Sequence, residues 1–69
     1  MTRGTAFVVT GRLLPGGTLP VLHVDGGGQW RLELPRRYRH LIGSRVEVEG
    51  VRDDFDILSV VQAKEADPR

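Results

Sequence analysis

With 69 residues, a formal net charge of +1 and no cysteine, the chain is short, nearly neutral and free of thiols. This length favours a single domain over residues 1–69, and the absence of cysteine excludes disulfide bridges and cysteine-ligated zinc. No apolar run is long enough for a signal-peptide core or a membrane span, so we expect a cytoplasmic protein without a membrane partner. A closed sheet or self-association then remains to stabilise so small a domain.

The charged residues are distributed unevenly along the chain. Residues 1–45 contain seven arginines and two carboxylates, a net charge of +5, whereas residues 46–69 carry a net charge of −4. Arginine outnumbers lysine nine to one, and its guanidinium group suits planar recognition of phosphate or carboxylate. A high-GC genome produces the same arginine excess, so the excess alone indicates no partner; the chain has a basic first part and an acidic second part.

Five segments have the composition or the alternation of β-strands. In residues 45–52, apolar Val46 and Val48 alternate with charged residues, which is the period-two pattern of a strand with one solvated face. The expected strands are residues 5–14, 19–24, 29–34, 45–52 and 55–63.

Residues 35–42 are the helical candidate, because Pro35 suits a first helical turn and Gly43 suits a helix end. Residues 1–4 and 64–69 are expected to be flexible ends. Three strands, a short helix and two further strands form the element order of an OB-fold. We therefore expect a mainly β protein, a small five-stranded OB-like (Greek-key) barrel with one short helix or turn between strands three and four. An SH3-like barrel is the alternative, and a helix at this position counts against it.

The glycine-rich sequence at residues 25–28 predicts a hairpin, and its register decides which side chains face outward. A three-residue loop with a bulge pairs Val24 with Trp30 and leaves His23 outside, opposite Arg31. A loop of two or four residues instead turns His23 toward the side of Trp30. We expect the first register because it gathers the apolar side chains of both strands on one face: Leu22, Val24, Trp30, Leu32 and Leu34.

Four segments have a recognisable combination of motifs: residues 10–14, 24–32, 41–46 and 48–50. A glycine-rich turn precedes Trp-Arg-Leu, and a Gly-Ser-Arg-Val-Glu-Val-Glu-Gly strand precedes Phe55-Asp56-Ile57-Leu58. In this combination the chain resembles a bacterial family of short proteins known only as a domain of unknown function. The resemblance covers nearly the whole chain and implies an OB-like barrel, but it brings no catalytic or ligand-binding residues.

The candidate binding surface is an arginine-rich run with interleaved aromatic residues, since arginine binds phosphate and bases stack on aromatic rings. The candidate residues for nucleic-acid or anion binding are His23, Trp30, Arg31, Arg36, Arg37, Tyr38, Arg39 and Arg45. The alternative is a solvated surface on which the arginines pair with glutamates, each pair worth about 0–1 kcal/mol. For Trp30, the face shared with two leucines favours a core position over a stacking platform.

Two loops have the composition of ligand sites but suit turns better. The glycines at residues 25–28 could cradle a phosphate, but the sequence lacks the Gly-Lys-Ser/Thr and the helix of a P-loop. The three aspartates of residues 53–56 could bind a divalent cation, but the segment is too short for an EF-hand and its charge would repel nucleic acid. We expect no metal site and no cofactor.

Neither His23 nor His40 has a serine or carboxylate at a recognisable catalytic spacing, so we do not expect an enzyme. The leading hypothesis is a binding module for single-stranded nucleic acid or another anionic ligand. The alternative is a protein-interaction or self-assembly domain, monomeric or weakly dimeric, that uses Leu19 and Val21 or an unpaired barrel edge.

Overall fold

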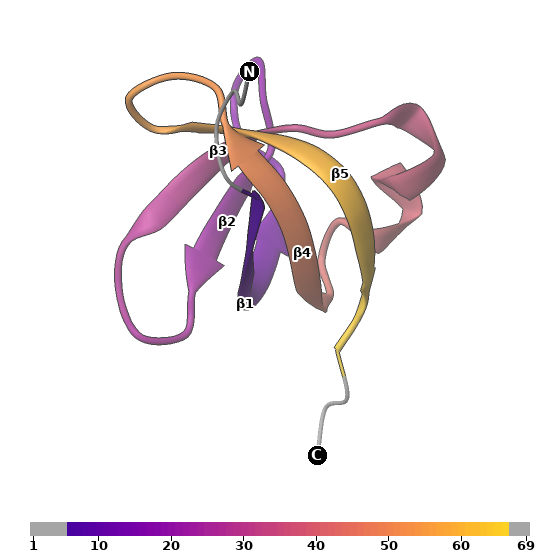
Figure 1. Cartoon of the computed structure of the whole chain (residues 1–69). Helices are drawn as coiled ribbons and strands as arrows, with labels where there is room; N and C mark the ends of the chain where they lie inside the picture. Colours follow the sequence, from indigo (N-terminus) through magenta and orange to yellow (C-terminus); the bar gives the residue numbers. More distant parts are fainter. Residues whose placement is uncertain (1–5, 67–69) are drawn as a thin grey trace.

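The computed structural model describes residues 6–66, in which five strands close into a barrel and one short helix lies between the third and fourth strands (Figure 1). The elements are β1 (Ala6–Leu14), β2 (Val21–Val24), β3 (Gln29–Glu33), the 3₁₀ helix η1 (Arg36–Leu41), β4 (Arg45–Arg52) and β5 (Ile57–Glu65). The expected mainly β, OB-like barrel with one short helix at this position is confirmed. The expected flexible residues 1–4 lie outside the described part of the chain, as do residues 67–69.

The barrel has the strand order β1-β2-β3-β5-β4, and β4 pairs back onto β1 to close it. All neighbouring strands are antiparallel except β3 and β5, which run parallel with Arg31 opposite Ile57 and Glu33 opposite Ser59. This parallel contact joins the hairpin of β2 and β3 to the hairpin of β4 and β5. It thereby brings residues that are about 25 positions apart in the chain side by side.

β1 connects the two halves of the barrel because it pairs with β4 and also with β2. Gly11 lies where both pairings are present, opposite Val24 of β2 and Val46 of β4. A Cβ atom at Gly11 would lie 2.0 Å from the carbonyl oxygen of His23, so no larger residue fits without moving β2. Gly11 is thus required by the close approach of the neighbouring backbone.

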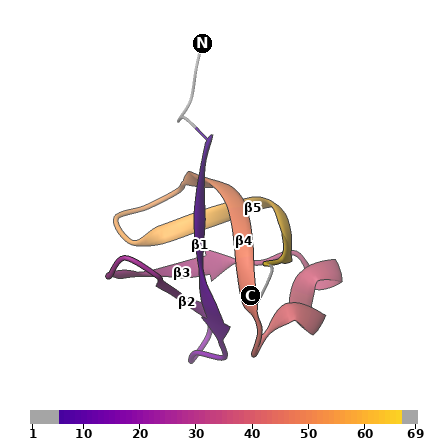
Figure 2. The same ribbon diagram turned by 90° about the horizontal axis from the view of Figure 1, so that it is seen from below.

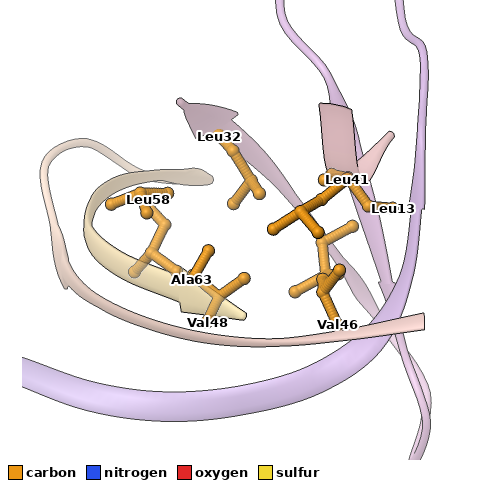
Figure 3. Close-up of a cluster of buried hydrophobic side chains, with 9 residues drawn as sticks. Leu13, Leu32, Leu41, Val46, Val48, Leu58 and Ala63 are labelled. Carbon is orange, nitrogen blue, oxygen red and sulfur yellow. The ribbon is translucent and has the colours of Figure 1, made fainter. Parts of the chain in front are cut away.

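The core occupies the barrel interior, and all five strands and η1 contribute to it (Figure 3). Six side chains are fully buried: Leu13, Leu22, Leu32, Val46, Val48 and Leu58. Val46 and Val48 alternate with outward-facing residues, as the period-two pattern of this segment predicts. Leu41 of η1 is only 7% exposed and joins the same cluster, which ties the helix to the barrel.

The glycine-rich hairpin has the expected faces but not the expected register. Trp30 lies opposite Leu22 rather than Val24, and His23 lies opposite Gln29. The difference equals a two-residue shift in the pairing, which preserves the alternation of side chains. The side chain of His23 is therefore exposed as expected, and the apolar residues still face inward.

The glycines of this hairpin explain the difference in register. The backbone N–H of Val24 donates to the carbonyl of Gly28 at 3.0 Å, and the carbonyl of Val24 accepts from the N–H of Gly27 at 3.0 Å. The loop therefore has three residues with a glycine bulge, as expected, but it closes on Gly28 rather than on Trp30. Gly27 and Gly28 both have positive φ, at 115° and 85°, which a glycine adopts without strain. Arg31 consequently lies opposite Val21, and the prediction that it faces His23 is wrong.

β5 starts and ends two residues later than the sequence pattern indicates. Phe55 lies in the loop before the strand, and Lys64 belongs to β5 rather than to a flexible tail, where it lies opposite Glu47. The pairing of β4 and β5 shifts between Glu49 and Gly50, which leaves Val61 as an additional, exposed residue in β5. The loop of residues 53–56 between the strands is called the β4–β5 loop below.

Candidate anion-binding surface

η1 has one face that anchors it to the barrel. In a 3₁₀ helix, residues three apart lie on the same face, and Tyr38 and Leu41 have this spacing. Leu41 is buried and Tyr38 is half-buried against the core. The backbone N–H of Tyr38 donates to the carbonyl of Pro35 at 2.9 Å, and Gly43, with φ at 102°, ends the segment.

The remaining residues of η1 form a strongly basic outer face. Arg36, Arg37, Arg39 and His40 are all exposed, and the helix has no acidic residue in its first turn. Among residues 6–66, no carboxylate forms an ion pair with these three arginines. The helix therefore carries three positive charges that nothing in the described part of the chain neutralises. We call Arg36, Arg37, Arg39 and His40 the η1 surface.

Tyr38 belongs to the face of η1 that anchors the helix to the barrel and not to the η1 surface. The guanidinium carbon of Arg37 lies 4.8 Å from the centroid of its ring, in a cation–π arrangement. One side of the ring thus contacts an arginine while another packs against the core. Tyr38 therefore orients Arg37, and little of its ring is left for stacking on a base.

Arg31 differs from the helix arginines because it is bound to a carboxylate. Its Nε and Nη2 atoms donate to the two carboxylate oxygens of Asp56 at 3.2 and 2.9 Å. The hydrogen bond from Arg31 holds the pKa of Asp56 below its ordinary value, and the same contact raises the pKa of Arg31. The parallel pairing of β3 and β5 creates this contact, and it leaves Arg31 neutralised.

Arg45 also has an acidic partner. Its guanidinium donates to the carboxylate of Asp25, which lies in the β2–β3 hairpin loop. Two of the predicted site arginines, Arg31 and Arg45, are therefore held in ion pairs. The predicted arginines therefore form two groups: those that pair with a carboxylate and those that have no such ion pair among the described residues.

A basic row crosses the outside of the barrel next to the end of η1. Arg45 on β4 lies opposite Arg12 on β1, which lies opposite His23 on β2. Arg12 is exposed, and its Nη1 donates to the carbonyl of Gly43 at 3.3 Å, directly after η1. Arg12 was not among the candidates from the sequence, although its outward position next to inward Leu13 is visible in the strand alternation.

Trp30 contributes to packing at the rim of the core. Its ring centroid lies 5.6 Å from that of Phe7, at a tilt of 51°. The side chain is half-buried and packs against the core cluster together with Val9 and Val24. Trp30 therefore packs against the core, unlike the exposed arginines with which the sequence analysis grouped it.

The β4–β5 loop has the opposite electrostatic character to η1. It contains Asp53, Asp54 and Asp56, and the charge of Asp53 is the main reason that the pKa of Glu33 is raised. Phe55, within this loop, is 80% exposed. Sequence reasoning missed this exposed aromatic because Phe55 precedes an apolar run and was assigned to the strand.

The described residues contain no pocket and no group of three or more histidine, cysteine, aspartate or glutamate side chains arranged to hold a metal ion. Among them, no helix has the length and apolar character to cross a membrane. What distinguishes the surface is the distribution of its charges.

The fold and this surface define a small OB-like barrel with a basic helical surface. The family described as "Protein of unknown function (DUF5818)" matches residues 10–66, and the chain belongs to this family. The resemblance to a domain of unknown function is thereby confirmed. No curated protein and no solved structure matches the chain.

Proposed function

We propose that this protein is a binding module that holds single-stranded nucleic acid on the η1 surface. The observation that carries the proposal is the set of three exposed arginines without an acidic partner among the described residues. Each arginine that neutralises a phosphate releases condensed counterions, which favours binding at low salt. The planar guanidinium group also binds phosphate through two parallel hydrogen bonds.

The surroundings of η1 support a path for a strand rather than a contact with one phosphate. Six residues at a rise of about 2 Å give η1 a length of about 12 Å, enough for about two or three phosphates. Arg12 and His23 continue the basic character onto the outside of the barrel beyond the end of the helix. The proposed site therefore comprises the η1 surface with Arg12 and His23 beside it.

The proposal differs from the sequence-based hypothesis in the residues it uses. Arg31 is neutralised by Asp56, and Trp30 packs at the rim of the core, so neither is assigned to the site. Arg45 is paired with Asp25 and is likewise not assigned to the site. Binding then depends mainly on phosphate contacts and shows little preference for base sequence.

The experiment is a fluorescence anisotropy titration of a labelled oligothymidylate at several salt concentrations. Three phosphate contacts to a single strand give a slope of about −2 for log K against log salt, and one contact gives about −0.7. The variant Arg36→Glu with Arg37→Glu is expected to lose at least about tenfold in affinity at low salt and to approach the shallower slope.

The matched control is Arg31→Glu with Arg52→Glu, which lowers the net charge by the same amount at two arginines outside the proposed site. Thermal unfolding verifies that both variants are folded. Affinity should remain closer to wild type in the control than in the η1 variant. An equal loss in the two variants, or a wild-type affinity that salt does not change, would contradict the proposal.

A second candidate function, association with a protein, is supported by Phe55. The Phe55 side chain is 80% exposed, and aromatic residues are enriched at protein interfaces. It lies in the β4–β5 loop, whose acidic residues oppose a nucleic-acid contact there.

A further inference from the structure

Two oppositely charged surfaces lie on opposite sides of the barrel. In Figure 1 and in the rotated view of Figure 2, η1 projects from one side and the β4–β5 loop from the other. The first carries the three helix arginines, and the second carries the three loop aspartates with Glu33 nearby. Because the surfaces face away from each other, they cannot neutralise one another within one molecule.

The β4–β5 loop presents an aromatic side chain inside an acidic rim. The Phe55 ring is 80% exposed, although the guanidinium of Arg52 lies over it at 5.9 Å from its centroid. The loop is held in shape by the Asp54 carboxylate, which accepts a hydrogen bond from the Phe55 N–H at 2.7 Å. The ring is thus displayed on an ordered turn rather than folded back onto the barrel.

Glu33 and Asp53 add negative charge that no cation pairs with among the described residues. The raised pKa of Glu33 arises chiefly from repulsion by Asp53. A cationic partner that sits between or over them relieves this repulsion. The loop therefore has two requirements that its own chain meets only in part, further cover for the exposed Phe55 ring and a positive counter-charge.

The η1 surface supplies both requirements in one segment. It offers Arg36, Arg37 and Arg39, and a guanidinium group both pairs with carboxylates and lies over aromatic rings. The guanidinium of Arg37 already lies over the Tyr38 ring in this chain. The charge and the chemistry of the two surfaces therefore match.

We propose that copies of this chain associate head to tail, with the β4–β5 loop of one copy docked on the η1 surface of the next. The contact is heterologous, because it joins two different surfaces. Each copy inside the assembly uses both surfaces, so the assembly grows rather than stopping at a dimer. One loop and one short helix bury much less than about 1,000 Å², so the association is weak and strongly reduced by salt. Self-association and oligonucleotide binding then compete for the same arginines.

The test uses charge reversal on one surface at a time. The helix variant is Arg36→Glu with Arg37→Glu, and the loop variant is Glu33→Arg with Asp53→Arg. The loop variant leaves Asp54 and Asp56 intact because they hydrogen-bond Phe55 and Arg31. The helix variant alone presents negative charge on both surfaces, and the loop variant alone loses the net negative charge of its loop. Their mixture again contains one wild-type loop and one wild-type η1 surface, which can pair.

Sedimentation equilibrium at low salt measures the weight-average mass against concentration. The wild-type mass should rise above the 7.7 kDa of the monomer with increasing concentration and return to it when salt is added. Each variant alone should remain at the monomer mass, and their equimolar mixture should regain the rise. Phe55→Ser should weaken wild-type association several-fold while leaving oligothymidylate affinity unchanged.

Three outcomes would overturn the inference: a wild-type protein that stays monomeric at about 1 mM in low salt, a mixture no heavier than its components, or a mass that saturates at twice the monomer. If the protein stays monomeric but binds oligothymidylate with a steep salt dependence, only the proposal of self-association is contradicted. A protein that associates as described but binds no oligonucleotide would instead remove the proposed function and leave this inference intact.

Discussion

The strand arginines and the helix arginines have the same side chain but different surroundings. Arg31 on β3 and Arg45 on β4 each meet a carboxylate, whereas the arginines of η1 meet none among the described residues. Asp56 reaches Arg31 because β3 and β5 lie side by side, and Asp25 reaches Arg45 from the β2–β3 loop. A strand position alone is not sufficient, since Arg12 on β1 has no carboxylate partner among the described residues. A count of arginines in the sequence therefore overstates the charge available to an anion.

The largest expected effect comes from unfolding the barrel, because the fold positions both groups of arginines. Leu22→Ala deletes a fully buried core side chain and should lower the free energy of unfolding by about 2–5 kcal/mol. This is a large part of the stability of so small a domain. Urea denaturation followed by Trp30 fluorescence measures the loss, and oligothymidylate binding should fall in step with the folded fraction.

The matched control for this core variant is Val61→Ala, which truncates an exposed side chain of β5. Its free energy of unfolding should stay within about 0.5 kcal/mol of wild type. If Leu22→Ala cost no more than Val61→Ala, the assignment of the core would be wrong.

A smaller effect is expected from a variant that leaves a strand arginine without its acidic partner, as the helix arginines are among the described residues. Asp56→Asn removes the partner of Arg31 and leaves its guanidinium exposed with an uncompensated charge. Oligothymidylate affinity at low salt should rise by about twofold to fivefold, with a steeper salt slope. Anisotropy titrations measure both.

Asp53→Asn is the control for this gain, because it removes the same charge from the same loop without releasing an arginine. Its affinity should rise less than that of Asp56→Asn. Equal gains would mean that only net charge matters and that the contrast between paired and unpaired arginines has no functional consequence.

The smallest expected effect is a pH dependence of stability with two opposing parts. The pKa of Glu33 is raised in the folded protein, so its protonation relieves repulsion from Asp53, and stability should increase as the pH falls from neutral through that raised pKa. The pKa of Asp56 is lowered, so its contribution is present above the ordinary aspartate pKa and is lost as the pH falls through the lowered value.

Thermal unfolding at a series of pH values should therefore show a small rise of the midpoint on mild acidification, followed by a fall. Glu33→Gln should remove the rise, and Asp56→Asn should reduce the fall. A rise that persists in Glu33→Gln would show that another group causes it.

The fold was predictable because its signals are local and repeated. The alternation of valine and glutamate in β4 specifies one buried face, and Pro35 and Gly43 mark the limits of the helical segment. Element order then selects the OB-like topology from a small set. The hairpin register was not predictable in the same way, because three successive glycines allow several loop geometries with the same alternation.

The candidate site was predictable only in part. The exposed arginines of η1 follow from the helical spacing of Tyr38 and Leu41, which leaves the charged residues outside. The pairing of Arg31 with Asp56 depends on a parallel strand contact that no local pattern encodes. Phe55 is apolar and lies just before β5, so the sequence pattern includes it in the strand, although its backbone belongs to the β4–β5 loop.

The most direct test of the account is an NMR titration of ¹⁵N-labelled protein with an unlabelled oligothymidylate at low salt, at a dilution where the protein is monomeric. The account predicts that the largest amide and guanidinium shifts occur in Arg36, Arg37 and Arg39, with Arg12 next, and that the Arg31 side-chain signal stays in place. Shifts centred on Arg31 and the β2–β3 face, or no saturable shifts, would contradict the assignment of η1 as the anion-binding surface.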